Sequence, residues 1–471
     1  RDQMFGPVGH RGATRQRLRL GMDAEGRLTA IEHHTIATTS AHDDFLEGAS
    51  GASLSLYAAP AIRTGHSGVR VDTGTPGPMR APGLASGNAA LECAIDEAAA
   101  AIGLDPLEFR LRNYAETDPA TGRPFSSKAL RDCYAKGADL FGWDRRPLEP
   151  GRMTDRDGRL VGWGMGTALF HCPMFAAEAR ATLRADGTAL VETAAADMGQ
   201  GAWTALAQIA ADGLGLDLDR VEFRAGDSAL PDAGVAGGSG HTATAGTALY
   251  EAGKDVVAQL VEMAVADPQS PLYGAGNQSI RAEGGRLFLA ADAARGESYA
   301  AILARAGCRD LSGRGAGSRT PEAAQAHAMY AHGAVFAEVT VDPDLLQMRV
   351  TRLTGVFAAG RIINPRLAES QLLGGMIWGL SFALHEEGLF DPRTGAPVNG
   401  DLAGYHVPVH ADLPHLEALT VHEEDAYVNA LGVKGVGELA ITGTVGAIAN
   451  AVWHATGRRA RRFPIHIADL L

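Results

Sequence analysis

Four glycine-rich loops, each leading into a segment with helical spacing, constrain this sequence more than any other feature. They span residues 73–83, 197–201, 234–240 and 432–438, and they carry Arg80, Gln200, Ser239 and Glu438 respectively. Glycine permits positive φ and lets the backbone approach a ligand closely. A helix start presents free N–H groups that suit anions. Any one such loop is an ordinary strand-to-helix turn, but the four together predict convergence on one large polar ligand carrying phosphates.

Composition and charge narrow the class of protein. The chain has 471 residues, 46% of them hydrophobic, which is enough for a large core and two or three domains. A net charge of -13, with basic residues clustered only at 458–462, argues against nucleic acid and anionic membrane as partners. The longest apolar run, 372–384, is shorter than the roughly 20 residues that a bilayer requires, so it predicts a buried helix and no membrane span.

The four cysteines, Cys93, Cys133, Cys172 and Cys308, are scattered along the chain. Without any Cys-x-x-Cys pair, an iron–sulfur cluster or structural zinc on this chain is not expected. Buried thiols are the more ordinary interpretation, with disulfides as the alternative.

Hydrophobic periodicity predicts an α+β fold, that is, a mixed α/β class with hairpin sheets and Ala-rich helices. Alternating residues predict hairpins over 17–37, 180–195 and 334–357. Helical spacing occurs at 86–102, 202–214, 246–265, 368–385 and 443–456. Polar composition with Pro and Gly at 144–160 suggests a boundary between a first domain, 1–145, and a second, 146–471; residues 309–326 suggest a long surface connection.

Several other chemistries lack their motifs. The sequence has no Gly-x-x-x-x-Gly-Lys-Ser/Thr, no Gly-x-Gly-x-x-Gly after a strand and no Gly-x-Ser-x-Gly, which disfavours P-loop, Rossmann and nucleophile-elbow sites. His422-Glu423 begins like a zinc-protease helix but lacks the second His, and Pro408 separates His406 from His410. We therefore expect these histidines to be hydrogen-bonded or exposed.

The motifs together resemble those of a known family. They are Met79–Gly83, Met198–Gly201, Gly237–Ser239, Gly360–Pro365 and Lys434–Glu438, in the family's order. From about residue 4 to 460 the chain looks like the molybdenum-binding large subunit of the xanthine oxidase / aldehyde oxidase family. The Met-Arg-Ala-Pro-Gly form and Val8–Arg11 are similar to the bacterial three-subunit aldehyde oxidoreductases.

The resemblance implies a molybdopterin cytosine dinucleotide cofactor, with an oxo/sulfido molybdenum held by the pterin dithiolene and no side chain ligating the metal. Glu438 matches the family's general base, and Phe170 falls near a substrate-pocket position, with an ordinary core Phe as the alternative. The residues implied to bind the cofactor are Arg80, Gly199, Gln200, Gly201, Gly237, Gly238, Ser239, Lys434, Gly435 and Gly437.

The implied reaction is oxidation of a small aldehyde to a carboxylic acid, with water as the oxygen source. Electrons would pass to a 2Fe-2S subunit and an FAD subunit, since the chain itself has no cluster cysteines or flavin motif. The alternatives are hydroxylation of an N-heterocycle or purine by the same cofactor, and a non-catalytic assembly or binding subunit. The segment Phe45-Leu46-Glu47-Gly48 lacks the arginine of purine hydroxylases, which favours aldehydes.

Further departures from the family concern the cofactor site and the partners. The family's Phe-Gly-Gly loop and the domain before it are missing, so either a separate chain supplies them or the site is incomplete. Trp378 stands where some members have a glutamine. The chain starts at Arg1 without a signal-peptide pattern, which predicts a fragment or a processed product. Bacterial cytoplasm and periplasm are both compatible with the resemblance.

Overall fold

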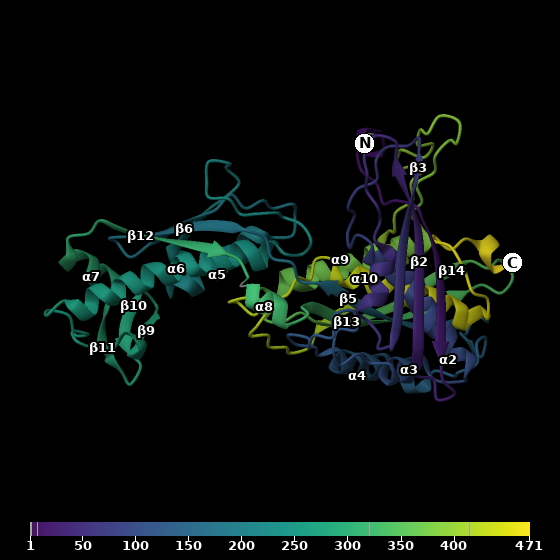
Figure 1. Cartoon of the computed structure of the whole chain (residues 1–471), viewed down its shortest axis with the longest axis horizontal. Helices are drawn as coiled ribbons and strands as arrows, with labels where there is room; N and C mark the ends of the chain where they lie inside the picture. Colours follow the sequence, from purple (N-terminus) through teal and green to yellow (C-terminus); the bar gives the residue numbers. More distant parts are fainter. Residues whose placement is uncertain (1, 7, 320, 414) are drawn as a thin grey trace.

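The computed structural model describes residues 2–6, 8–319, 321–413 and 415–471. Figure 1 shows an elongated molecule with two parts along its long axis. The smaller part contains α5, α6, α7 and the sheet of β6 and β12, and the larger part contains the remaining long helices and both chain ends. The class is mixed α/β, as the periodicity predicts.

The larger part is built on a five-stranded sheet with the order β15-β14-β13-β5-β4. Its strands β13 and β14 form one of the predicted hairpins, and β5 pairs antiparallel with β13 along its whole length. The bounds are β4 Met153–Thr154, β5 Leu160–His171, β13 Tyr330–Val341, β14 Met348–Ala358 and β15 Leu416–Thr420.

Helix α10 (Leu439–Thr456) lies directly against β5, and glycines make this possible. Gly162, Gly164 and Gly166 alternate along the face of β5 that meets the helix. A Cβ atom built on any of them would come closer than 3.0 Å to the backbone of α10. The helix therefore rests backbone against backbone on the strand, which fixes the position of its first residue.

The smaller part repeats this arrangement. Its four-stranded sheet has the order β12-β6-β7-β8, and α6 (His241–Ala266) covers it. Gly313, Gly315 and Gly317 of β12 face the α6 backbone, again with no room for a Cβ atom. The strands are β6 Ala177–Arg184, β7 Ala189–Glu192, β8 Val221–Arg224 and β12 Asp310–Gly317.

The expectation of a surface connection over 309–326 is wrong. This stretch forms β12, which pairs antiparallel with β6 over eight residues, and then α8 (Pro321–Ala326). The glycines of this stretch, Gly313, Gly315 and Gly317, recur every second residue because they lie on the face of the strand against which α6 packs.

A third sheet, of order β1-β2-β3, packs with α2 in the larger part (Figure 1). Its hairpin turns at Asp23–Gly26, as predicted. A small three-stranded sheet of β9, β10 and β11 lies beside α7 in the smaller part. The bounds are β1 Thr14–Met22, β2 Leu28–Ser40, β3 Ala61–Val71, α2 Leu84–Ala101, β9 Ile280–Glu283, β10 Arg286–Leu289, β11 Asp292–Ser298 and α7 Tyr299–Ala306.

The remaining helices agree with their predicted segments within a few residues. Helix α5 covers Ala202–Leu214 and α9 covers Pro365–Leu384, while α2, α6 and α10 begin two to five residues before the predicted starts. The short helices of the larger part are α1 Asp2–Phe5, α3 Pro106–Arg112 and α4 Leu130–Phe141. No helix among the described residues is long and apolar enough to cross a membrane. The domain boundary at 145/146 stays a prediction.

The close packing of α10 on Gly162, Gly164 and Gly166 leads to a stability prediction. In Gly164→Ala, the new methyl group would meet the main chain of Ala447 and Ala451, so helix and strand must separate. Overpacking of this kind costs roughly 3 kcal/mol. Urea unfolding measures the change in free energy. The matched control is Gly276→Ala, because Gly276 has φ of -72° and nothing within 4 Å of its Cβ position. Equal stability of the two variants would contradict the conclusion that α10 needs glycine at position 164 to pack on β5.

Candidate active site

Glu438 occupies the residue just before α10, and its side chain reaches away from its own helix. Its carboxylate makes no capping bond to α10. Instead Oε1 accepts a hydrogen bond from the main-chain N–H of Ala81 at 2.9 Å, and Oε2 accepts one from the hydroxyl of Ser239 at 2.9 Å. One carboxylate thus joins three of the four glycine-rich loops.

Unusual backbone conformations place these two donors. Ala81 has φ of +58° and Ser239 has φ of +57°, which side-chain-bearing residues rarely adopt. Gly435 lies so close to Ser239 that a Cβ atom on residue 435 would overlap it. The loops before α6 and α10 therefore touch, and a glycine is required at the contact.

Arg80 holds the loop that ends at Glu438 in place. Its Nε donates to the carbonyl oxygen of Gly437 at 2.5 Å, and its Nη2 donates to that of Gln371 in α9 at 2.7 Å. Burial lowers the pKa of Arg80, whereas attraction to Glu438 opposes this shift. The guanidinium fork therefore fixes the segment that carries Glu438 and adds positive charge beside its carboxylate.

Lys434 points into a buried ionic cluster. Its ammonium donates to the hydroxyl of Ser127 at 2.6 Å and to Glu423 at 3.1 Å, and it lies 3.4 Å from Asp425. Its side chain is fully buried. Glu423 in turn accepts from the main chain of Gly360 at 2.9 Å. The cluster fixes the start of the loop that ends at Glu438, and a contact of Lys434 with the cofactor stays a prediction.

The loop of Gln200 is held separately, at the junction with α9. Asp197 accepts hydrogen bonds from the main-chain N–H groups of Gly199 at 2.8 Å and Gly201 at 3.3 Å. Gly201 has φ of +75° and packs against Leu367 of α9. The Gln200 Oε1 accepts from the N–H of Met198 at 2.7 Å. Its amide nitrogen makes no hydrogen bond within the described residues, which leaves it available to a ligand.

The loops before α6 and α10 present unused main-chain donors. Among the residues that the structure describes, these N–H groups form no hydrogen bond with the protein main chain or side-chain oxygens: Gly237, Gly238, Ser239, Val436, Gly437 and Glu438. They precede helix N-termini, where the positive end of the helix dipole favours anions. The two contacting loops can therefore bind a negatively charged group.

Phe170 lies near the end of β5, beyond the glycines that support α10. Its side chain is only 1% exposed and belongs to the main core, which is the alternative that the sequence left open. Its ring stacks on His171 at 4.4 Å between centroids. Burial lowers the pKa of His171, and the negative charge of Glu438 opposes this shift, so the two side chains are near enough to interact electrostatically.

Three residues of the site escaped the sequence interpretation. Glu47 is fully buried, and its Oε1 accepts from the main-chain N–H of Gly83 at 2.8 Å, which positions the Arg80 loop. Gln371 supplies the carbonyl that holds Arg80, although the family resemblance directed attention to position 378 instead. Asp197 orders the Gln200 loop. Only Asp197, which comes directly before a recognised motif, had a signal that could have identified it.

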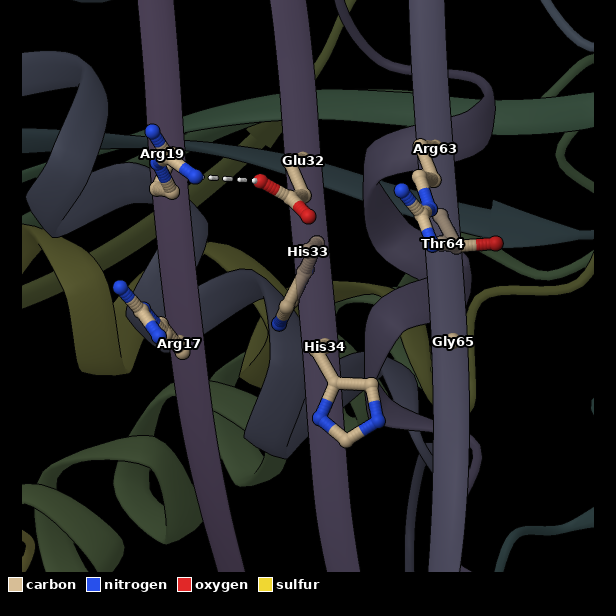
Figure 2. Close-up of a pocket in the computed structure, with 8 residues that line it drawn as sticks. All are labelled: Arg17, Arg19, Glu32, His33, His34, Arg63, Thr64 and Gly65. Atoms are coloured by element: carbon tan, nitrogen blue, oxygen red, sulfur yellow. Dashed lines mark hydrogen bonds and ion pairs between the residues drawn. The ribbon is translucent and has the colours of Figure 1, made fainter.

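A separate concavity of about 270 Å³ lies on the β1–β2–β3 sheet (Figure 2). Figure 2 shows Arg17 and Arg19 on β1 beside Glu32 and His34 on β2, with an ion pair of 3.4 Å between Arg19 and Glu32. None of the described residues in the four glycine-rich loops lines it. In the part of the chain that the structure describes, no group of three or more His, Cys, Asp or Glu is arranged to hold a metal ion.

Comparisons with protein families and curated proteins give a consistent result. Models of the molybdopterin cofactor-binding domain match residues 1–114 and 136–414. The aldehyde oxidoreductase molybdenum-binding subunit PaoC of Escherichia coli (strain K12) is 38% identical over 98% of this chain and 61% of its own length. The putative xanthine dehydrogenase molybdenum-binding subunit XdhA of that organism is 29% identical over 95% of this chain and 60% of its own.

Solved structures share the fold. Quinoline 2-oxidoreductase from Pseudomonas putida 86 aligns with a TM-score of 0.85 at 24% identity, over 97% of this chain and 61% of that chain. The aldehyde oxidoreductase from Desulfovibrio gigas gives 0.77 at 24% identity, over 97% and 48%. The chain thus spans 61% or less of the length of each of these four relatives. With domain models matching most of its length, the chain belongs to the molybdopterin-binding large subunits of the xanthine oxidase and aldehyde oxidase family.

Proposed function

We propose that this chain is the catalytic part of a molybdenum hydroxylase that oxidises aldehydes to carboxylic acids, with Glu438 as general base. The observation that carries the proposal is the position of the Glu438 carboxylate, where the loops of Arg80 and Ser239 meet the start of α10. A carboxylate held by donors from two other loops is a positioned base and not a surface residue.

The residues present fit a molybdopterin dinucleotide. The unused N–H groups at 237–239 and 436–438 suit its phosphates, and the free amide of Gln200 suits an oxo group or the pterin. We propose the cytosine form of the cofactor, which the resemblance to the bacterial three-subunit aldehyde oxidoreductases implies. The chemistry supplied by such a group is delivery of an oxygen from water and acceptance of the two electrons that the aldehyde loses.

The protein's own contribution is to move a proton. Each Glu438 oxygen accepts one hydrogen bond in the structure, and an ionised carboxylate has about four acceptor positions, so acceptor positions stay open for the proton to be removed. The bonds from Ala81 and Ser239 hold the oxygens in one orientation. Arg80 fixes the main chain next to Glu438 through its hydrogen bond to Gly437.

Aldehydes are the substrate class that we favour over purines. The segment 45–48 contains no arginine to orient a purine, and the carboxylate of Glu47 is buried there as a hydrogen-bond acceptor for Gly83 and Ser86. The name of PaoC records an aldehyde oxidoreductase subunit, and that of XdhA a xanthine dehydrogenase subunit. Turnover of benzaldehyde, xanthine and quinoline by the assembled enzyme separates these substrate classes directly.

The proposed function requires partner subunits. The four cysteines are all free and distant from one another in sequence, so this chain offers no cluster ligands in the described residues. We propose that electrons leave to a 2Fe-2S subunit and then to an FAD subunit. A non-catalytic subunit would bind no molybdenum in an active complex, and metal analysis of the purified complex distinguishes the two.

Glu438→Gln tests the base. The amide oxygen can still accept from Ala81 and the amide nitrogen can donate to Ser239, so the local structure should survive. Loss of a general base alone lowers kcat by roughly 10²–10⁴-fold. We expect this loss in steady-state aldehyde oxidation with unchanged molybdenum content.

The control for this variant is Glu108→Gln, a carboxylate in the first turn of α3 that is exposed and remote from the four loops. It should oxidise aldehydes at the rate of the unaltered protein. A Glu438→Gln enzyme with near-normal kcat and full molybdenum would show that another group accepts the proton.

Lys434→Met tests the buried cluster beneath the site. The substitution leaves Glu423 and Asp425 buried without their cation, which costs about 3–5 kcal/mol. Urea unfolding should show the loss. Combining it with Glu423→Gln, which removes one of the two stranded charges, should recover part of it. If Lys434→Met is as stable as the unaltered chain, the ammonium does not hold the loop.

A further inference from the structure

A cavity of about 200 Å³ opens where β5 ends, and residues that follow this strand connect its wall to the loops of the proposed active site. Its wall includes His171, Cys172 and Pro173 from the end of β5, and Met329 and Tyr330 from the start of β13. The proton transfer to Glu438 does not use this space.

The cavity is connected to the reaction site through the β5 residues. His171 is close enough to Glu438 for the carboxylate to influence its pKa. The thiol of Cys172 lies against the main-chain N–H of Gly435. Pro173 packs against the loop before α6, with its Cγ 3.3 Å from the Cβ position of Gly238. Three consecutive residues of the wall, His171 to Pro173, therefore neighbour Glu438 and the two loops that meet there.

Two arginines give the cavity its charge. Arg123 donates to the Thr121 hydroxyl and to the Ala324 carbonyl, and Arg319 donates to the carbonyls of Val428 and Cys172. Within the described residues, Nη2 of Arg123 and Nη1 of Arg319 make no hydrogen bond, and neither guanidinium pairs with a carboxylate. Both side chains are half-buried and anchored by uncharged partners.

No carboxylate on the wall compensates these charges. Among the described residues, no Asp or Glu lines the cavity. Burial lowers the pKa of Arg319, and Asp425 opposes this shift from a distance. Asp425, however, is already bound by Lys434 at 3.4 Å and by the Ser126 hydroxyl at 2.6 Å. The positive charge therefore lacks a counterion of its own, and a half-buried cation gains most from an anionic ligand.

The cavity also contains a histidine and an apolar surface, which indicate what kind of anion it would bind. His327 lies in the wall, stacked on Tyr427 at 4.2 Å, and its buried Nδ1 has no hydrogen-bond partner among the described residues. Met329 and the ring of Tyr330 offer an apolar surface beside these polar groups. An organic body with one carboxylate would satisfy both the apolar wall and the unused donors.

We infer that the cavity holds the carboxylate of the substrate, so that the preferred substrates are aldehydes that also carry a carboxylate. This inference rests on the proposed aldehyde oxidation and specifies its substrate class. The carboxylate is unchanged in the reaction: the aldehyde carbon loses its hydrogen and two electrons to the molybdenum cofactor and gains oxygen from water. Arg123, Arg319 and His327 act as specificity residues that orient the substrate.

The test uses the assembled, molybdenum-loaded enzyme and two aldehydes that differ by one group, 4-carboxybenzaldehyde and benzaldehyde. We expect kcat/KM to be at least about tenfold higher for the carboxylated aldehyde, the effect of roughly one charge-assisted hydrogen bond. Arg123→Gln should abolish this preference, so that kcat/KM becomes similar for the two aldehydes. The control Arg131→Gln removes an arginine of α4 that pairs with Glu116 at 2.7 Å and does not line the cavity; it should keep the preference.

A binding measurement makes the test independent of turnover. Calorimetric titration should show that the protein binds benzoate more tightly than the neutral benzamide, and that Arg123→Gln and Arg319→Gln each weaken benzoate at least about tenfold. Equal affinity for benzoate and benzamide would overturn the inference. Loss of pterin and molybdenum from the variants would also overturn it, because the arginines would then bind the cofactor phosphate.

The outcomes also separate this inference from the proposed function. Oxidation of both aldehydes at equal efficiency contradicts the substrate class but leaves aldehyde oxidation intact. Failure to oxidise either aldehyde, with molybdenum bound, contradicts the proposed function. In that case the benzoate titration still decides whether the cavity binds carboxylates.

Discussion

The contact of α10 with the glycines of β5 is the constraint on which the site depends. Because Gly162, Gly164 and Gly166 have no side chains, the helix backbone lies directly on the sheet and cannot slide without steric overlap. The first residue of this helix is preceded by Glu438. The packing of α10 on β5 therefore fixes the position of Glu438 independently of the loop contacts.

The same kind of packing positions the loop that carries Ser239. Helix α6 lies on Gly313, Gly315 and Gly317 of β12, and the Ser239 loop precedes it. The N-termini of α6 and α10 lie close together, and the Ser239 hydroxyl donates a hydrogen bond to Glu438 at 2.9 Å. A ligand bound between these two helix starts would then contact loops whose positions are set by backbone packing and not by flexible side chains.

Much of the local structure could be predicted from the sequence, because it depends on neighbouring residues. Helix periodicity predicted α5 at its observed bounds, and the Asp23–Gly26 turn predicted the β1–β2 hairpin. The loop residues Arg80, Ser239 and Glu438 were recognised by type and order, and the structure brings them together. Their contacts connect residues 199 and 357 positions apart, which no local pattern encodes. The stretch 309–326 was wrongly predicted as a surface connection, because the glycine-rich strand β12 is defined by its packing against α6, a distant segment.

The most direct test of the central claim is a structure of the molybdenum-loaded protein. We predict that the pterin lies between the loops before α6 and α10, with its phosphates on the free N–H groups of those loops and the metal's ligands within hydrogen-bonding reach of the Glu438 carboxylate. A metal bound elsewhere, or a Glu438 side chain that faces solvent with no cofactor atom beside it, would contradict the assignment of Glu438 as the base.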